Sequence, residues 1–196
     1  GTTKMELDEE SPILFYADEK TYDSELGILI LKGNVEFSQK GNVLEADYVT
    51  YNEQSDIITA SGNVRLRQVD GDIYFAEYME LQGDLKDGFA RHLRGLMTDD
   101  GKIVAVESRL KGDIEEFDKS VYTPCDFCGN RPPVWQINAQ KTVKDDGTKD
   151  IYFTDAQLRM FDVPVLYFPF LKVISLPKNL SFAKSVVFVY EIFAVD

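Results

Sequence analysis

The sequence predicts an all-β protein, in which stacked two-stranded units form an open, elongated β-jelly roll or short β-solenoid. Three observations lead to this prediction. A unit of about 30 residues recurs along the first 115 residues, its apolar residues alternate with polar ones, and Gly, Asn and Asp mark regular turns. Because a two-stranded unit cannot bury its apolar face alone, stacking of several units is expected to enclose a continuous apolar interior.

The repeat is visible at three places within each unit. A small apolar residue followed by an acid recurs at spacings of 29, 30 and 30 residues, as Ala17-Asp18, Ala46-Asp47, Ala76-Glu77 and Val106-Glu107. Two turn sequences also return, Gly33-Asn34-Val35 as Gly62-Asn63-Val64 and Gly41-Asn42-Val43 as Gly71-Asp72-Ile73. Each unit therefore contains two strands and two turns, and one supersecondary unit is used four times.

The apolar residues within the units have the period of a β-strand. Two sets at matching positions, 29 residues apart, each share one parity: Leu29, Leu31, Val35 and Phe37, and Ile58, Ala60, Val64 and Leu66. Alternation of period two is typical of strands with one buried face. No segment between residues 13 and 115 combines helical apolar spacing with a cap and sufficient length. Short antiparallel strands are expected throughout, and a bulge after Asp47 could switch the buried face.

The remaining elements divide the chain into an N-terminal extension (1–12), a β-domain (13–170) and a divergent C-terminal tail (171–196). Strands over 135–158 are followed by an apolar exit, Val163–Phe170, whose two prolines exclude a central strand or a helix and favour an extended segment. Something else is expected to cover this aromatic surface. The open edges of the sheet are expected near residues 13–18 and 135–158, where a neighbouring module could add a strand.

Charge and hydropathy argue against nucleic-acid binding and against a transmembrane helix. The formal net charge of −13 argues against nucleic acid, because binding to phosphates depends on Lys and Arg. No run of 18 apolar residues occurs, so no transmembrane helix is expected. With 44% apolar residues, the 196-residue chain has enough for the core of one elongated domain.

Cys125 and Cys128 form a Cys-x-x-Cys pair that can indicate zinc, redox chemistry or a disulfide. A zinc site needs four ligands, and the single histidine, His92, lies far upstream. Redox pairs normally lie at a helix N-terminus, whereas this pair lies in a Pro-rich loop. A structural or partner-directed disulfide in an oxidising compartment is therefore favoured.

Nothing in the sequence indicates an enzyme or a cofactor. His92 has no Ser or Cys at a recognisable spacing, and it is expected on the surface of a strand or half-buried. The repeated acids Asp18, Asp47, Glu77 and Glu107 could suggest hydrolysis or calcium binding, but a repeated position is more often architectural. We expect them in an outer row, where turn or backbone bonding and solvation explain them.

The motifs resemble one family. Tyr122-Thr123-Pro124-Cys125 with Cys128, Pro133-x-Trp135-x-Ile137-x-Ala139, Ala156-x-Leu158 and Val163-Pro164-Val165-Leu166-Tyr167-Phe168-Pro169 resemble the periplasmic N-terminal domain of the LptD family, the outer-membrane lipopolysaccharide assembly or organic solvent tolerance proteins. The upstream repeats resemble the OstA-type jelly-roll module of lipopolysaccharide transport proteins. The resemblance covers roughly residues 13 to 170.

The resemblance implies an open, V-shaped β-jelly roll at the periplasmic face of the outer membrane, whose interior carries the acyl chains of lipopolysaccharide without catalysis. The implied partners are a periplasmic bridge protein that joins by β-strand addition, and an outer-membrane β-barrel with its plug lipoprotein. It implies a disulfide role for Cys125 or Cys128. The implied lipid-lining residues are Leu31, Val35, Phe37, Leu44, Ala46, Ile58, Ala60, Val64, Leu66 and Ala76.

Two expectations stand beside this interpretation. The chain stops soon after Pro169, so the barrel is expected to be missing and the sequence to be a fragment or a truncated product. The alternative function is a structural or adhesive scaffold whose interior is fully packed and binds no ligand. In a packed scaffold, placing Asp at Phe37 or Val64 should unfold the domain, whereas in a conduit it should block lipid binding.

Overall fold

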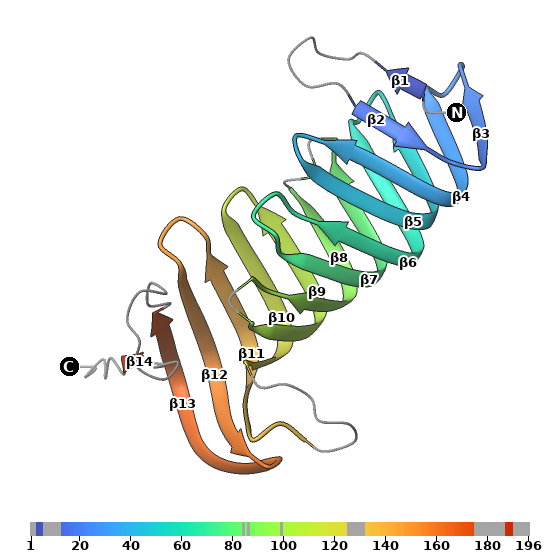
Figure 1. The fold of residues 1–196 in the computed structure, drawn as a ribbon. Helices are drawn as coiled ribbons and strands as arrows, with labels where there is room; N and C mark the ends of the chain where they lie inside the picture. Colours follow the sequence, from blue (N-terminus) through green and yellow to red (C-terminus); the bar gives the residue numbers. More distant parts are fainter. Residues whose placement is uncertain are drawn as a thin grey trace.

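The computed structural model describes residues 3–5, 13–83, 85, 87–98, 100–124, 132–174 and 187–189. Within these ranges every regular element is a strand, and the strands form one 14-stranded sheet (Figure 1). The all-β prediction is therefore confirmed. The strands are β1 (Thr3–Met5), β2 (Ile13–Tyr16), β3 (Glu19–Asp23), β4 (Ile28–Gln39), β5 (Asn42–Asn52), β6 (Ile57–Arg67), β7 (Ile73–Gln82), β8 (Gly88–Leu96), β9 (Lys102–Lys111), β10 (Ile114–Thr123), β11 (Trp135–Asp145), β12 (Asp150–Met160), β13 (Val163–Ile174) and β14 (Val187–Val189).

The sheet is an antiparallel meander that stays open. From β4 to β14 each strand pairs with the next one along the chain, while β3 pairs with the first part of β4 and β2 pairs with its second part. Figure 1 shows the strands stacked along one long axis, with β1 and β14 at opposite ends of the stack. No described helix is long and apolar enough to cross a membrane.

A line of bulges crosses the strands near their middles. The registers shift between Lys32 and Val35 and between Ser61 and Val64. Left-handed backbone recurs on every second strand, at Asn34 (φ 45°), Asn63 (48°), His92 (51°), Lys119 (50°) and Asp155 (50°). A bulge bends its strand and increases the local twist. The line of bulges therefore divides the sheet into two leaves.

The two leaves are defined by strand segments on either side of the bulges. The first leaf comprises 28–32, 48–52, 57–61, 78–82, 88–91, 107–111, 114–118, 141–145 and 150–154, and the second comprises 35–39, 42–46, 64–67, 73–76, 93–96, 102–105, 120–123, 135–139 and 156–160. On β5 the buried positions change parity from Ala46 to Val49, so the face switch considered after Asp47 is confirmed.

Aromatic side chains from the two leaves meet across the interior. The ring centroids of Phe37, in the second leaf, and Tyr51, in the first, are 6.2 Å apart. Farther along the sheet, those of Tyr122, in the second leaf, and Phe153, in the first, are 5.8 Å apart. All four side chains are buried. The leaves therefore face each other and enclose the hydrophobic core, as expected for a jelly roll.

Three of the four repeated acids have an architectural role, as predicted, but their partners are side chains of the bulges. Asn34 Nδ2 donates to Asp18 Oδ2 at 2.8 Å, and Asn63 Nδ2 donates to Asp47 Oδ2 at 2.7 Å. The same bond is made in the third unit by His92 Nδ1 and Glu77 Oε2, which are 2.7 Å apart. These contacts lie on the exposed surface beside the bulges.

The predicted position of the fourth repeat unit, at Val106-Glu107, is wrong by one residue. Ala105, not Val106, pairs with Leu93 as Ala76 pairs with Val64, and Ala105 is buried. Val106 is 43% exposed on the outer face. Ala105 lies 29 residues after Ala76, the same spacing as between Ala17 and Ala46.

The prediction for the last edge of the sheet was wrong. Strands β11 and β12 are internal, and β13 runs through both Pro164 and Pro169. Strand β14 pairs with β13 only over 172–174, so within the described residues β13 is an edge from 163 to 171. Proline is compatible with an edge strand because no partner needs its missing N–H. At the other end, β2 is covered by the three residues of β1.

Candidate functional site

The ten residues predicted to line a lipid track all lie in the core between the leaves. Nine are buried, and Ala76 is partly buried and packs against the same cluster. Their strands, β4 to β7, place them on both leaves, with Leu31 and Ile58 on the first and Phe37 and Leu44 on the second. The structure therefore brings this set together as one apolar surface. Lipid contact at these positions stays a prediction.

The apolar interior extends well beyond the predicted set. Buried apolar residues continue along β8 to β13, and they include Leu93, Ile103, Phe117, Ile137, Phe153 and Leu171. Sequence reasoning missed them because the bulges change the buried parity within β8, β9 and β10. The alternation on either side of each bulge was the signal that could have found them.

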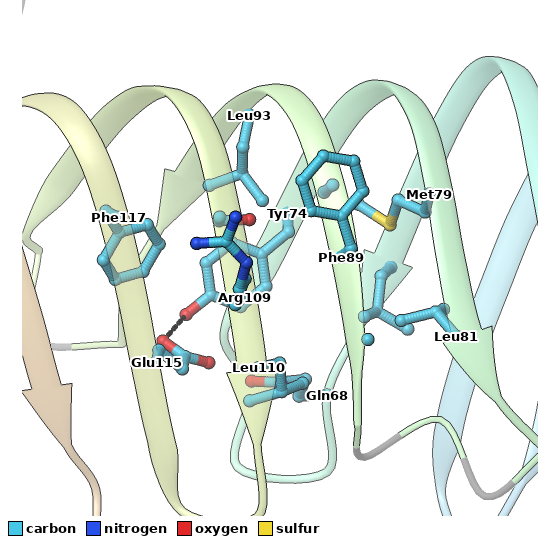
Figure 2. Close-up of a pocket in the computed structure, with 14 residues that line it drawn as sticks. Gln68, Tyr74, Met79, Leu81, Phe89, Leu93, Arg109, Leu110, Glu115 and Phe117 are labelled. Atoms are coloured by element: carbon cyan, nitrogen blue, oxygen red, sulfur yellow. Dashed lines mark hydrogen bonds between the residues drawn. The ribbon is translucent and has the colours of Figure 1, made fainter.

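A small cavity lies in this interior between the two leaves (Figure 2). Its volume is about 30 Å³. Leu66 and Leu93 line it from the second leaf, and Met79, Leu81 and Phe117 line it from the first. A volume of this size has room for about one or two water molecules. The side chains of the leaves therefore nearly fill the interior around this cavity.

Polar side chains from both leaves meet at one wall of this cavity. Tyr74 donates its hydroxyl proton to Glu115 Oε2 at 2.6 Å, as Figure 2 shows. Lys144 Nζ lies 2.6 Å from Asp72 Oδ2, 3.2 Å from Glu115 Oε2 and 3.2 Å from an oxygen of Asp146. The side chains of Asp72, Glu115 and Lys144 are 4%, 5% and 11% exposed. Sequence reasoning gave no indication of this cluster.

The electrostatics of the cluster keep Lys144 charged. Burial alone would lower its pKa, but Glu115 and Asp72 outweigh burial and raise it. Burial also raises the pKa of Glu115, and the attraction of Lys144 only partly offsets that effect. Burial would raise the pKa of Asp72 as well, but hydrogen bonds from Lys144 and Thr98 hold it below its ordinary value. In this cluster the cation Lys144 forms a hydrogen-bonded ion pair with Asp72, and the acidic groups of Glu115 and Asp146 lie around the same cation.

The outer face of the second leaf carries a wide groove of about 820 Å³. Phe75, Arg94 and Val104 line it along one row, and His92 and Lys119 lie at the bulges. The His92 side chain is 60% exposed and bonded to Glu77, so its predicted surface position is confirmed. Its partner is still more exposed, at 77% for the Glu77 side chain.

The expectations on disulfides and metals concern different parts of the chain. Cys125 and Cys128 lie outside the described residues, so their pairing stays a prediction. In the part of the chain that the structure describes, no three His, Cys, Asp or Glu side chains are grouped as metal ligands.

Comparisons with known proteins identify related sequences. A family model described as OstA-like protein matches residues 10–117. The chain is 30% identical over 151 residues to the LPS-assembly protein LptD of Nitrosococcus oceani, covering 74% of this chain and 20% of that protein. It is 26% identical over 172 residues to LptD of Pseudomonas fluorescens, covering 83% of this chain and 17% of that protein. The chain thus spans about a fifth of the length of these curated relatives.

Among solved structures, the chain is similar to LptH of Pseudomonas aeruginosa, described as the LptA-homologous periplasmic component of a lipopolysaccharide transport device. The sequence identity is 15%, and the match covers 94% of this chain and 99% of LptH, with a TM-score of 0.32.

Proposed function

Because this chain belongs to the OstA-like protein family, we propose that it is a non-enzymatic module of lipopolysaccharide transport. The proposal is supported by the similarity over most of the chain to LPS-assembly proteins LptD. One structural observation carries it: two leaves of a single open sheet face each other over a continuous apolar interior, from Phe37 at one end to Phe153 at the other.

In this proposal the interior receives the acyl chains of the lipid. Burial of apolar groups contributes roughly 0.8 kcal/mol for each methylene, which favours binding of long chains over a polar ligand. The net charge of −13 suits acyl chains better than a phosphorylated headgroup, which carboxylates repel. The headgroup would stay outside the leaves, in water or in contact with cations.

The proposed location is the periplasmic face of the outer membrane, where modules join end to end. A periplasmic bridge protein would add a strand at the end formed by β1 and β3, and an outer-membrane β-barrel with its plug lipoprotein would lie beyond β13. Support comes from the edge that β13 forms within the described residues and from its side chains Val165, Tyr167 and Phe170, which are 47%, 57% and 60% exposed. In this oxidising compartment Cys125 or Cys128 would form a disulfide.

The test is photo-crosslinking of the 196-residue chain to lipopolysaccharide. A photoreactive phenylalanine analogue replaces Phe37 or Phe117, which are 0% and 1% exposed in the interior. The matched control is Phe75, which lies on the outer face of β7 between the inward residues Tyr74 and Ala76. Lipid adducts at Phe37 and Phe117, with little at Phe75, support the proposal. Absence of adducts at both interior sites in a folded protein contradicts it.

One observation favours the alternative of a packed scaffold. Leu31, Phe37 and Ile58 have no exposed surface, and the cavity holds only about 30 Å³. A scaffold with no ligand would keep this packing, whereas a conduit must separate its leaves when lipid enters. The crosslinking experiment decides between them, because a permanently packed interior gives no adduct at Phe37.

A further inference from the structure

The polar cluster described above ties the two leaves together across the interior. We call Asp72, Tyr74, Glu115 and Lys144 the clasp. Asp72 and Tyr74 belong to the free end of the second leaf, at the turn before β7 and at its start. Glu115 and Lys144 belong to the free end of the first leaf, on β10 and β11. Their bonds at 2.6 and 3.2 Å therefore join regions that are not neighbours in the sheet.

The clasp lies where the interior would have to widen. The cavity beside it has a volume of about 30 Å³, and Tyr74 and Glu115 form part of its wall. An acyl chain that passes between Leu93, on the second leaf, and Phe117, on the first, must push the leaves apart at this point. Since Tyr74 and Lys144 bond to groups on the opposite leaf, the leaves cannot separate there while these bonds are intact.

The clasp differs in kind from the other contacts between the leaves. Phe37 on Tyr51, and Tyr122 on Phe153, are non-directional apolar contacts, and lipid methylenes can replace them with similar contacts. The hydrogen bonds of the clasp have no replacement in an acyl chain. Separating the clasp exposes a cation and carboxylates that then need water or other polar partners.

We propose that the clasp is a gate in the interior, which must open before an acyl chain can occupy the segment between β7 and β11. This inference rests on the proposed function. The closed state is the one that the structure shows, and lipid would bind to the fraction of molecules in which the clasp is open. Anything that favours the open state then raises apparent binding in this segment, because the competent fraction increases.

The test compares photo-crosslinking to lipopolysaccharide at two interior sites in clasp variants. The photoreactive analogue at Phe117 reports on the cavity beside the clasp, and the analogue at Phe37 reports on the interior far from it. The gate variant is D72N/E115Q/K144M, which removes the charges and leaves side chains of similar volume. The matched control is K141M/E116Q, because Lys141 and Glu116 form the same kind of pair on β11 and β10, 2.8 Å apart, on the outer face.

We expect the initial rate of adduct formation at Phe117 to rise about tenfold in the gate variant, with the rate at Phe37 and both rates in the control unchanged. A folded gate variant that labels Phe117 at the original rate overturns the gate, while labelling at Phe37 still supports the proposed function. Absence of adducts at Phe37 in every protein overturns the proposed function instead.

Circular dichroism establishes that each variant is folded at the temperature of the assay. If the gate variant is unfolded, the single variant D72N takes its place, because it keeps the side-chain shape and removes the carboxylate that lies 2.6 Å from Lys144 Nζ. Faster labelling at Phe117 in D72N supports the gate, and an unchanged rate contradicts it.

Discussion

A Cβ atom on Gly62 would lie 2.7 Å from Oδ2 of Asp47, closer than real Cβ contacts allow. The same relationship holds one unit earlier, where a Cβ on Gly33 would lie 2.6 Å from Oδ2 of Asp18. Both glycines have φ of +74°, which is unfavourable for any residue with a side chain. The Gly-Asn sequence and the acid of the preceding strand are therefore one device, in which Asn63 bonds the acid and Gly62 leaves room for it.

This device predicts a measurable difference between two glycines. G62A should lower the free energy of unfolding by more than about 1 kcal/mol, because it combines backbone strain with a clash against Asp47. G112A is the matched control, since Gly112 also has a left-handed φ of +58° but nothing within 4 Å of its Cβ position. Urea unfolding of both variants checks the prediction. Equal losses in the two variants would mean that the clash contributes nothing.

Such local devices explain why the repeat region could be predicted from the sequence. Alternation at Leu29 and Leu31, and turn residues such as Gly41, depend on neighbours in sequence and in the adjacent strand. The pairing of strands in an antiparallel meander also depends on neighbours in the sequence, because each strand contacts the next one along the chain. The C-terminal edge was harder to predict, since the sequence of β13 does not say whether a further strand covers Pro164 and Pro169.

The packing between the leaves gives a second prediction. Phe153 is 1% exposed and contacts Tyr122 across the interior, so F153A removes a large buried side chain. We expect a loss of about 3 to 5 kcal/mol in the free energy of unfolding. F161A is the control, because Phe161 is 62% exposed in the β12–β13 turn and its loss should change stability by less than about 0.5 kcal/mol. A small effect of F153A would show that the leaves are not tightly packed at this end.

The exposed strand β13 gives a third prediction. Leu166 is 54% exposed, and it lies among other exposed apolar side chains on the described edge of the sheet. Such a surface favours association. The purified chain should therefore self-associate with increasing concentration, and L166K should shift it toward the monomer in sedimentation velocity. V69K is the control, because Val69 is 73% exposed in the turn before β7, away from this edge. A chain that is monomeric at every concentration would contradict the prediction.

The clasp, by contrast, could not be predicted from the sequence. Lys144 lies 72 residues from Asp72, and their contact depends on how far the bulges bend every strand between them. Alternation placed neither residue in the interior, because charged side chains at inward positions are the exception to that pattern. The predicted lining ended at Ala76 for a different reason, because the bulges of the later strands change the buried parity and the alternation has to be followed separately on either side of each bulge.

Glu115 gives the last prediction, which concerns pH. Burial raises the pKa of this carboxyl above its ordinary value of 4.5, and the attraction of Lys144 and the hydrogen bond from Tyr74 only partly counteract burial. Between the ordinary value and the raised pKa the folded chain therefore binds more protons than the unfolded chain. The stability from protonated Glu115 is fully present below pH 4.5 and is lost as pH rises through the raised pKa.

The variant E115Q isolates this effect, because Gln at this position does not titrate. The free energy of unfolding of the original chain minus that of E115Q should therefore fall with rising pH, by at most about 1.4 kcal/mol per pH unit. Urea unfolding across a pH series measures this difference, and E116Q on the outer face corrects for the change in net charge. A difference that rises with pH would mean that Lys144 outweighs burial and holds Glu115 ionised.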